Sequence, residues 1–238
     1  ATGELADRPL RIMISAAEHS GEIHAANLID ALKDEARAAG LPEPDIRGLG
    51  GEALIERGMT SIGDPGSRAA MGFDGVLRTL PFYLGLLRDA TACARDWQPD
   101  LFLPVDSPAL HVPLARLVRG AGARAPKVAH FVTPQYWGWA PWRVKGYRKV
   151  VDLGLSILPF EPAWYGRHGV PASYIGHPLL DELAALDADG HARGSQRDQS
   201  APAPDGPLAI LPGSRAGVVR RNLPWMLDRV AELQAMPA

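Results

Sequence analysis

Short apolar runs alternate with amphipathic segments along most of the chain. Short apolar runs between turn residues predict strands, and apolar residues that recur every three or four positions predict helices. The predicted strands are residues 10–16, 46–49, 101–105, 127–132, 153–158, 172–175 and 208–211. The predicted helices include residues 25–39, 53–57, 109–119, 162–168 and 222–233. Because strands and helices alternate, we expect an α/β fold with a Rossmann-like parallel sheet and helices on both faces.

Residues 187–207 differ from the rest of the chain. They contain no large apolar side chain and are rich in Gly, Pro, Ser and charge, which predicts a flexible linker. We therefore expect an N-terminal domain at residues 8–186 and the start of a second Rossmann-like domain at residues 208–238. About thirty residues cannot bury a sheet on their own, so this second domain is expected to be truncated. The chain also lacks an initial Met, so we expect it to be a fragment of a longer protein.

Composition narrows the function classes. The 238 residues are 46% hydrophobic and 22% charged, as in ordinary globular domains, and the net charge of −2 gives no indication of a nucleic-acid partner. The single cysteine, Cys93, excludes an internal disulfide and the common cysteine-based metal sites. No apolar run is long enough to cross a bilayer, and the first residues lack the apolar core of a signal peptide.

The turn after the first strand is acidic. Residues 18–22 read Glu18-His19-Ser20-Gly21-Glu22, and in a doubly wound sheet this turn lies at the carboxyl edge, where ligands bind. Two carboxylates and a hydroxyl suit sugar hydroxyls better than a pyrophosphate, so the turn indicates a carbohydrate site. The alternative is helix capping, with Ser20 as the N-cap and acidic groups near the positive end of the helix.

Asp106 closes the predicted strand at residues 101–105. A carboxylate at the end of a buried strand is poorly solvated, which raises its pKa and suits it to act as a general base. The alternative is that Asp106 caps the helix that starts near Pro108. On spacing alone, both interpretations remain open.

Three further segments carry candidate chemistry. Three tryptophans could either stack on sugars or fill a core: Trp137, Trp139 and Trp142. A basic group follows them and could be either a solvated helix face or a contact for an anionic ligand: Arg143, Lys145, Arg148 and Lys149. His177 follows the strand at residues 172–175, although a lone histidine is more often structural. Residues 211–215 place Gly213, Ser214 and Arg215 at a strand-to-helix turn that could hold a phosphate.

Residues 72–87 carry more apolar groups than a simple helix face needs. Either these groups are buried, or an exposed part contacts an acyl chain or a bilayer surface. The common NTPase, dehydrogenase and zinc-protease motifs are not found in the sequence, so those functions are disfavoured.

Together these segments resemble the lipid-A-disaccharide synthase family, glycosyltransferases with the two-domain GT-B architecture. The resemblance rests on AEHSGE, MGFDGVL, PDLFLPVDSP, HFVTPQYWGWAPWRV, LPFEPAWY, YIGHPLLD and LPGSR, which occur in family order between residue 10 and about residue 220. It implies an inverting, metal-independent transfer without a cofactor. The donor would be UDP-2,3-diacylglucosamine and the acceptor 2,3-diacylglucosamine 1-phosphate, giving a β-1,6 disaccharide and UDP.

The resemblance also implies roles for single residues. Asp106 matches the base that deprotonates the acceptor hydroxyl. The acceptor and sugar contacts would be Glu18, Ser20, Gly21, Glu22, Trp137 and His177. The donor phosphate contacts would be Gly213, Ser214 and Arg215. The membrane or acyl contacts would be Phe73, Val76, Leu77, Leu80, Phe82 and Tyr83.

The chain departs from the family pattern at three places. Glu22 stands where the family usually has Asp, and Pro108-Ala109-Leu110-His111 stands where it usually has Pro-Asp-Phe-Asn. The later Ser-Gly-Thr-Ala segment does not occur before Ala238, so uridine contacts cannot be assigned, and this chain is expected to be inactive alone. The resemblance implies a cytoplasmic protein bound peripherally to the inner membrane; a homo-oligomer stays open. The alternatives are another GT-B UDP-sugar transferase, an epimerase, or a non-catalytic lipid- or membrane-binding module.

Overall fold

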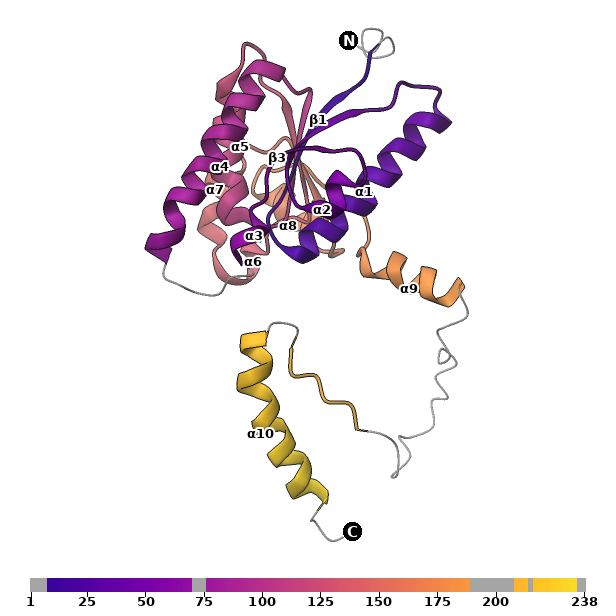
Figure 1. Cartoon of the computed structure of the whole chain (residues 1–238), viewed down its shortest axis with the longest axis vertical. Coiled ribbons are helices and arrows are strands. Elements are labelled where there is room, and N and C mark those ends of the chain that lie inside the picture. Colours follow the sequence, from indigo (N-terminus) through magenta and orange to yellow (C-terminus); the bar gives the residue numbers. More distant parts are fainter. Residues whose placement is uncertain (1–7, 70–75, 189–207, 214–215, 235–238) are drawn as a thin grey trace. The chain divides into compact units, whose positions relative to one another are not determined.

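The computed structural model describes residues 8–69, 76–188, 208–213 and 216–234 (Figure 1). The chain divides into two compact units, Ala1–Leu186 and Asp187–Ala238, and each is described by itself. In the first unit, a seven-stranded sheet has the order β3-β2-β1-β4-β5-β6-β7 and every pair of neighbours is parallel. The strands are β1 Arg11–Ala16, β2 Asp45–Leu49, β3 Thr60–Gly63, β4 Leu101–Val105, β5 Lys127–Phe131, β6 Leu153–Ser156 and β7 Ala172–Tyr174.

Helices cover both faces of this sheet, as Figure 1 shows for α1 and α2 on one side and α4 and α5 on the other. The helices are α1 His19–Ala38, α2 Glu52–Ile55, α3 Gly66–Ala69, α4 Val76–Trp97, α5 Pro108–Ala121, α6 Tyr136–Trp139, α7 Val144–Tyr147, α8 Glu161–Arg167 and α9 Leu179–Ala188, with a 3-10 turn η1 at Pro141–Arg143. The expected Rossmann-like α/β fold is thereby confirmed. The strand order reverses between β1 and β4, and in doubly wound sheets the ligand crevice lies at the carboxyl ends of the strands at such a reversal.

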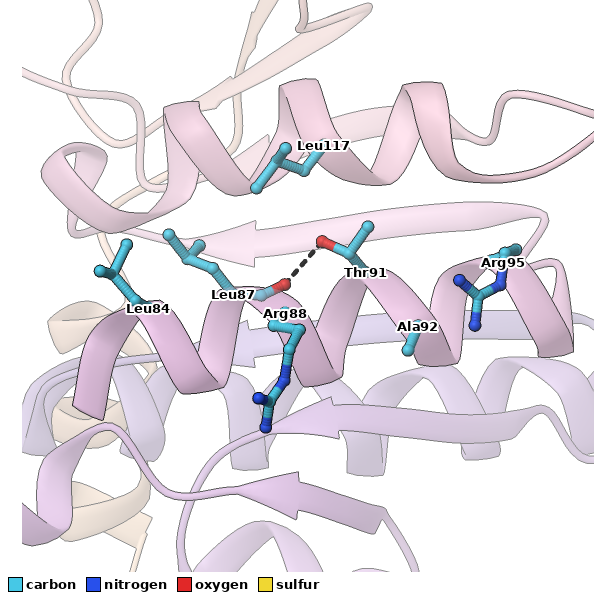
Figure 2. Close-up of a pocket in the computed structure, with 7 residues that line it drawn as sticks. All are labelled: Leu84, Leu87, Arg88, Thr91, Ala92, Arg95 and Leu117. Carbon is cyan, nitrogen blue, oxygen red and sulfur yellow. Dashed lines mark hydrogen bonds between the residues drawn. The ribbon is translucent and has the colours of Figure 1, made fainter. Parts of the chain in front are cut away.

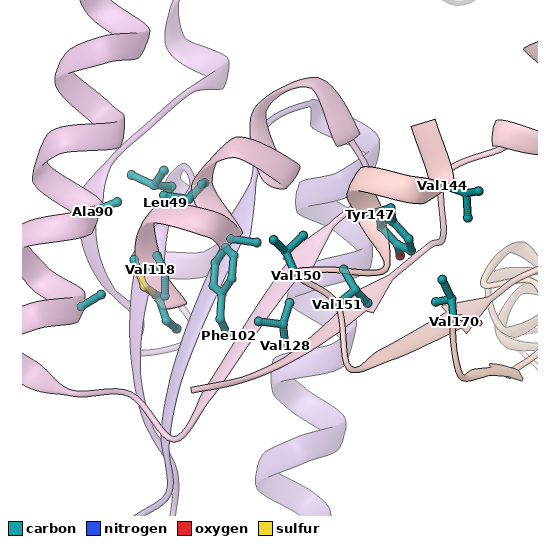
Figure 3. Packing of buried hydrophobic residues seen from close by; sticks show 14 of the residues in the cluster. Leu49, Ala90, Phe102, Val118, Val128, Val144, Tyr147, Val150, Val151 and Val170 are labelled. Carbon is teal, nitrogen blue, oxygen red and sulfur yellow. The ribbon is translucent and has the colours of Figure 1, made fainter. Parts of the chain in front are cut away.

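The strand period of two separates the core into two apolar clusters. Along β1, Ile12 and Ile14 pack under α1, whereas Met13 faces the opposite cluster under α4 and α5. Figure 3 shows the second cluster, where Phe102 of β4 and Val128 of β5 lie near Val118 of α5. Both faces of the sheet are therefore buried, as in doubly wound proteins.

The carboxylate of Asp100, just before β4, binds three groups near the amino ends of the strands. Its carboxylate accepts hydrogen bonds from the Arg8 guanidinium at 2.7 and 2.8 Å and from the Arg11 N–H at 3.0 Å, and it pairs with Arg124. The pKa of Asp100 is lowered to about 2, and the hydrogen bonds from Arg8 are the largest cause. This tie lies at the amino ends of β1 and β4, away from the crevice.

One glycine in the sheet is required by a close backbone approach. A Cβ atom on Gly48 of β2 would lie 1.7 Å from the carbonyl oxygen of Ile14 in β1. No side chain fits in that space. The neighbouring β2–β3 ladder also shifts register between Gly48 and Leu49.

The structure corrects several predicted elements. Helix α1 begins at His19, six residues before the predicted helix, so Glu18 and not Ser20 is its N-cap. Strand β3 and helices α3, α4, α6, α7 and α9 were not predicted. Most of these segments are only four residues long, whereas α4 buries Leu86, Ala90 and Ala94 at helical spacing but contains Pro81. Helix α4 packs one side on the core and leaves Leu84 on its other side 55% exposed.

In the second unit, the structure describes residues 208–213 and α10, Ala216–Gln234. The predicted strand at residues 208–211 is wrong: this segment forms no ladder with any described strand, and a strand needs a partner for its main-chain hydrogen bonds. The Asn222 side chain donates to the Pro212 carbonyl at 3.1 Å, which ties the segment to α10. Most of the predicted linker, residues 189–207, lies outside the described residues.

Candidate active site

The crevice at the strand-order reversal brings together two loops that are distant in sequence. Ala16 at the end of β1 is paired with Val105 at the end of β4, so the turn at Glu18 and the loop at Asp106 leave the same rim from neighbouring strands. The two loops therefore lie next to each other. The two carboxylates also interact, because the charge of Glu18 contributes to raising the pKa of Asp106.

Gly21 allows the first turn of α1 to sit close to the end of β4. It is buried, and a Cβ atom at this position would lie 3.6 Å from the Val105 carbonyl oxygen and 3.8 Å from the Val105 Cγ1. These are ordinary van der Waals distances, so a methyl group fits at this position. Ser20, one residue earlier, is exposed at the rim.

Asp106 and Ser107 both adopt left-handed backbone conformations, with φ of 52° and 42°. Such conformations cost roughly 1–2 kcal/mol for a residue other than glycine. Ser107 is the N-cap of α5 and makes no side-chain cap bond, so the capping role considered for Asp106 is not seen. The strained pair instead turns the chain sharply at the edge of the crevice.

The Asp106 carboxyl is partly buried, and burial is the main cause that raises its pKa. The Ser107 N–H bond to the carboxylate and the nearby His24 act in the opposite direction, while Glu18 adds to the rise. The predicted direction of the pKa shift is therefore found. A carboxylate with a raised pKa is a stronger base while it stays ionised near neutral pH.

Two buried histidines beside Asp106 were missed by the sequence analysis. The His111 Nδ1–H donates to the main-chain carbonyl of Asp106 at 2.7 Å, and the His130 Nε2–H donates to the same oxygen at 3.0 Å. The Nε2 atom of His111 lies 2.9 Å from the Ser15 hydroxyl on β1. Burial lowers the pKa of His111 to about 4 and that of His130 to about 3, so both rings are neutral at pH 7. A histidine inside an apolar helix or strand pattern gives no sequence signal of such a contact.

Glu22 is directed away from the crevice. Its carboxylate accepts the Ala53 N–H at 3.1 Å, and its Oε1 would lie 2.7 Å from a Cβ atom on Gly51. Glu22 therefore caps the start of α2 and supports the turn next to the site.

Trp137 belongs to a second polar cluster, centred on the buried carboxylate of Glu161. The Trp137 indole N–H donates to Glu161 at 3.0 Å, and its ring meets Phe160 edge-on with a centroid distance of 4.9 Å. The Thr133 hydroxyl and the Leu158 N–H also donate to Glu161, each at 3.2 Å. Glu161 was not singled out in the sequence, although it organises the loops after β5 and β6.

His177 is not brought next to Asp106. It follows β7, which is separated from β4 by β5 and β6, so the strands alone are about 14 Å apart. Its Nδ1 accepts the Leu179 N–H at 3.2 Å at the start of α9.

The predicted acyl-contact residues divide between core and surface. Phe82 and Tyr83 are half-buried, pack on the core and meet edge-on at 5.5 Å, whereas Leu80 is 48% exposed. Phe73 and the side chains of Val76 and Leu77 lie outside what the structure describes.

Further along α4, an open groove of about 380 Å³ lies between α4 and α5. Figure 2 shows Leu84 and Leu87 of α4 facing Leu117 of α5, with Arg88 and Arg95 on the α4 side. This groove faces away from the sheet and is separate from the crevice.

Of the predicted donor loop, only Gly213 is described; Ser214 and Arg215 lie outside the described residues. Gly213 has φ of 112°, and a Cβ atom there would lie 2.7 Å from the Val218 Cγ1 of α10. Only glycine therefore fits at this turn.

Within the part of the chain that the structure describes, no group of three or more His, Cys, Asp or Glu side chains is placed to hold a metal ion. In the same residues, every helix is too short or too polar to span a bilayer.

A doubly wound parallel sheet with two carboxylate-bearing loops at its switch point defines a Rossmann-like α/β protein. The sequence model of the lipid-A-disaccharide synthetase family matches residues 12–237, and the chain belongs to this family. It is 37% identical to the lipid-A-disaccharide synthase of Chromohalobacter salexigens over 95% of this chain and 36% identical to that of Alcanivorax borkumensis, again over 95%. The chain covers 58% and 56% of the lengths of these two relatives.

A solved structure supports the fold alone. A Listeria monocytogenes protein described as a UDP-N-acetylglucosamine 2-epimerase has a TM-score of 0.51 and 11% identity. The alignment covers 74% of this chain and 51% of the other.

Proposed function

We propose that this chain is the acceptor-side part of an inverting glycosyltransferase that makes the lipid A disaccharide. The observation that carries the proposal is the position of Asp106, a partly buried carboxylate with a raised pKa at the switch point of the sheet. Family membership over residues 12–237 supports the same substrates: a UDP-linked diacylglucosamine and a diacylglucosamine 1-phosphate.

In the proposed reaction, the Asp106 carboxylate takes the proton from the 6-hydroxyl of the acceptor. The acceptor oxygen then forms a bond to C1 of the donor sugar, while the bond from C1 to the diphosphate oxygen breaks and UDP leaves with the electron pair. Attack from the face opposite to UDP inverts the anomeric carbon and gives the β-1,6 linkage. The chain requires no metal or other cofactor for this proposal.

The turn at residues 18–21 would hold the acceptor sugar. Gly21 brings this turn against β4, Ser20 is exposed on it, and Glu18 lies close enough to Asp106 to influence its pKa. Glu22, Trp137 and His177 stay predictions as sugar contacts; the hydrogen bonds that each makes within the protein favour a supporting role. Gly213, Ser214 and Arg215 are proposed to hold the donor phosphates.

We also propose peripheral contact with the cytoplasmic face of the inner membrane through the start of α4. Exposed Leu80 and Leu84 support this contact. Co-sedimentation with phospholipid vesicles tests it: a double change of Leu80 and Leu84 to Ser is expected to reduce binding. Unchanged sedimentation would contradict the assignment of this surface.

The central test uses the protein expressed from its complete gene. Asp106→Asn removes the base and keeps the side-chain shape, so we expect UDP release with both acylated substrates to fall by on the order of 10²–10⁴-fold. Asp96→Asn, which changes an exposed aspartate paired with Arg95 at the end of α4, is the matched control and is expected to keep full activity. Circular dichroism should show the same fold for both variants.

Three results would overturn the proposal. Unchanged turnover in Asp106→Asn would remove the assigned base. Turnover of non-acylated UDP-sugars alone would favour another UDP-sugar transferase or an epimerase, and vesicle binding without any UDP release would favour a lipid-binding module.

A further inference from the structure

The main-chain carbonyl of Asp106 is held from two sides. His111 on α5 and His130 on β5 both direct ring nitrogens at this one oxygen, at 2.7 and 3.0 Å. A carbonyl oxygen only accepts hydrogen bonds, so both ring nitrogens must carry a proton. This fixes the tautomers: His111 is protonated on Nδ1 and His130 on Nε2.

Ser15 of β1 completes the arrangement. With its proton on Nδ1, the neutral ring of His111 has a free lone pair on Nε2, and the Ser15 hydroxyl at 2.9 Å donates to it. The Asp106 N–H in turn donates to the Phe131 carbonyl of β5 at 2.9 Å. The loop is thus fastened to strands on both sides of β4.

We propose that His111 and His130 are positioning residues that hold the Asp106 carboxylate in the direction required for proton transfer. The carbonyl carbon and the side chain share the Cα atom of Asp106, so fixing the carbonyl leaves only the side-chain torsions free. Asp106 and Ser107 hold left-handed conformations, which persist only where surrounding contacts hold them, and the two histidine donors are such contacts.

Burial supports this role over a direct part in proton transfer. Both rings are fully buried, and their lowered pKa values keep them neutral. Both rings make their hydrogen bonds to the main-chain carbonyl of Asp106 and not to its carboxylate. The two histidines therefore contact the backbone of Asp106 and not its reacting carboxylate.

The two contacts of His111 can be separated by substitution. The Nδ2 atom of Asn occupies nearly the same position relative to the backbone as the Nδ1 atom of His, so His111→Asn keeps a donor for the Asp106 carbonyl. The contact from Nε2 to Ser15 depends on histidine.

The test compares variants that keep or remove each donor in the protein from the complete gene. His111→Asn and His130→Gln keep an amide N–H near the original donor position; His111→Leu and His130→Leu remove it. We expect the donor-keeping variants to stay within about threefold of the original kcat. Because misplacement of a catalytic group by about 1 Å can cost on the order of 10²-fold, the donor-removing variants should lower kcat by roughly 10- to 100-fold with little change in KM.

The inference rests on the proposed function for its kinetic part, so a second readout is independent of activity. Correlation spectra of ¹⁵N-labelled histidine side chains should show His111 as the neutral Nδ1–H tautomer and His130 as the neutral Nε2–H tautomer at pH 7. The opposite tautomers, or charged rings, would overturn the inference. So would equal kcat in the Leu and Asn variants at residue 111 when both fold. If Asp106→Asn stays active while the tautomers are as stated, the assignment of the base fails and the carbonyl contacts stand.

Discussion

Glu18 and Asp106 face the same crevice from adjacent strands, and the negative charge of Glu18 contributes to raising the pKa of Asp106. Burial is the larger cause, and the Ser107 N–H and His24 partly offset both. Asp106, the proposed base, therefore lies beside a second carboxylate whose charge raises its pKa further. This relationship connects the sugar turn after β1 to the chemistry proposed after β4.

Removing the charge of Glu18 should therefore change the pH dependence of the reaction. In Glu18→Gln the pKa of Asp106 falls, so the acidic limb of the plot of kcat/KM against pH moves to lower pH. The profile moves in this direction because Asp106 acts as a base only when it is ionised. A profile that stays in place would mean that Glu18 does not act on the base.

Gly21 provides a test of the close approach between α1 and β4. Gly21→Ala adds a methyl group at an ordinary contact distance of 3.6 Å from the Val105 carbonyl oxygen, so folding and activity should change little. Gly21→Val adds further atoms toward β4 and should raise KM for the acceptor and lower the melting temperature. Equal behaviour of the two variants in thermal melts and in kinetics would contradict this packing.

The buried histidines predict a loss of stability in mild acid. The pKa of His111 is lowered to about 4 and that of His130 to about 3, whereas an unfolded histidine titrates near 6.5. Below about pH 6.5 the unfolded chain binds protons that the folded chain excludes. Stability is therefore highest above that pH and falls toward pH 4, by up to about 1.4 kcal/mol per pH unit for each histidine.

The measurement is denaturant unfolding between pH 7 and pH 5, with His130→Gln as the comparison. This variant cannot take up the proton, so its stability should depend less steeply on pH. If the free energy of unfolding changes with pH equally in both proteins, His130 takes up its proton as readily in the folded as in the unfolded chain.

Asp100 predicts a separate effect at stronger acidity. Its pKa is lowered from 3.8 to about 2, so its contribution is present above pH 4 and is lost as the pH falls through 2. Asp100→Asn should reduce the free energy of unfolding at pH 7 by about 2 kcal/mol, and the difference from the original protein should shrink toward pH 2. A difference that is constant with pH would show that the charge of Asp100 is not the stabilising element.

Glu161 offers a stability test in the second polar cluster. Its carboxylate accepts bonds from Thr133, Trp137 and Leu158 in the interior. Glu161→Leu leaves these donors without an acceptor and should destabilise the fold by about 3 kcal/mol. Trp137→Phe removes only one donor and should cost about 1 kcal/mol, measured by thermal unfolding. A larger effect of Trp137→Phe on KM than on stability would favour the predicted sugar contact instead.

The sequence by itself determined the α/β class, most strands and the rim on which candidate residues lie. These follow from local patterns, since apolar runs and the turns that end them depend on near neighbours in the chain. Asp106 at a strand end and Gly21 in an acidic turn were identified in this way. Strand β3 was not identified because it is only four residues long, and helix α4 was not identified because Pro81 and exposed apolar residues such as Leu84 obscure its helical pattern.

Only the tertiary structure decided which side chains meet. Pairing of β1 with β4 placed Glu18 beside Asp106, although 88 residues separate them in the numbering. Pairing of β4 with both β1 and β5 brought His111 and His130 to the Asp106 carbonyl and Ser15 to His111. Other contacts between distant residues turned Glu22 toward α2 and Trp137 toward Glu161. Hydrogen bonds between such distant residues depend on register and burial, which no local pattern in the sequence encodes.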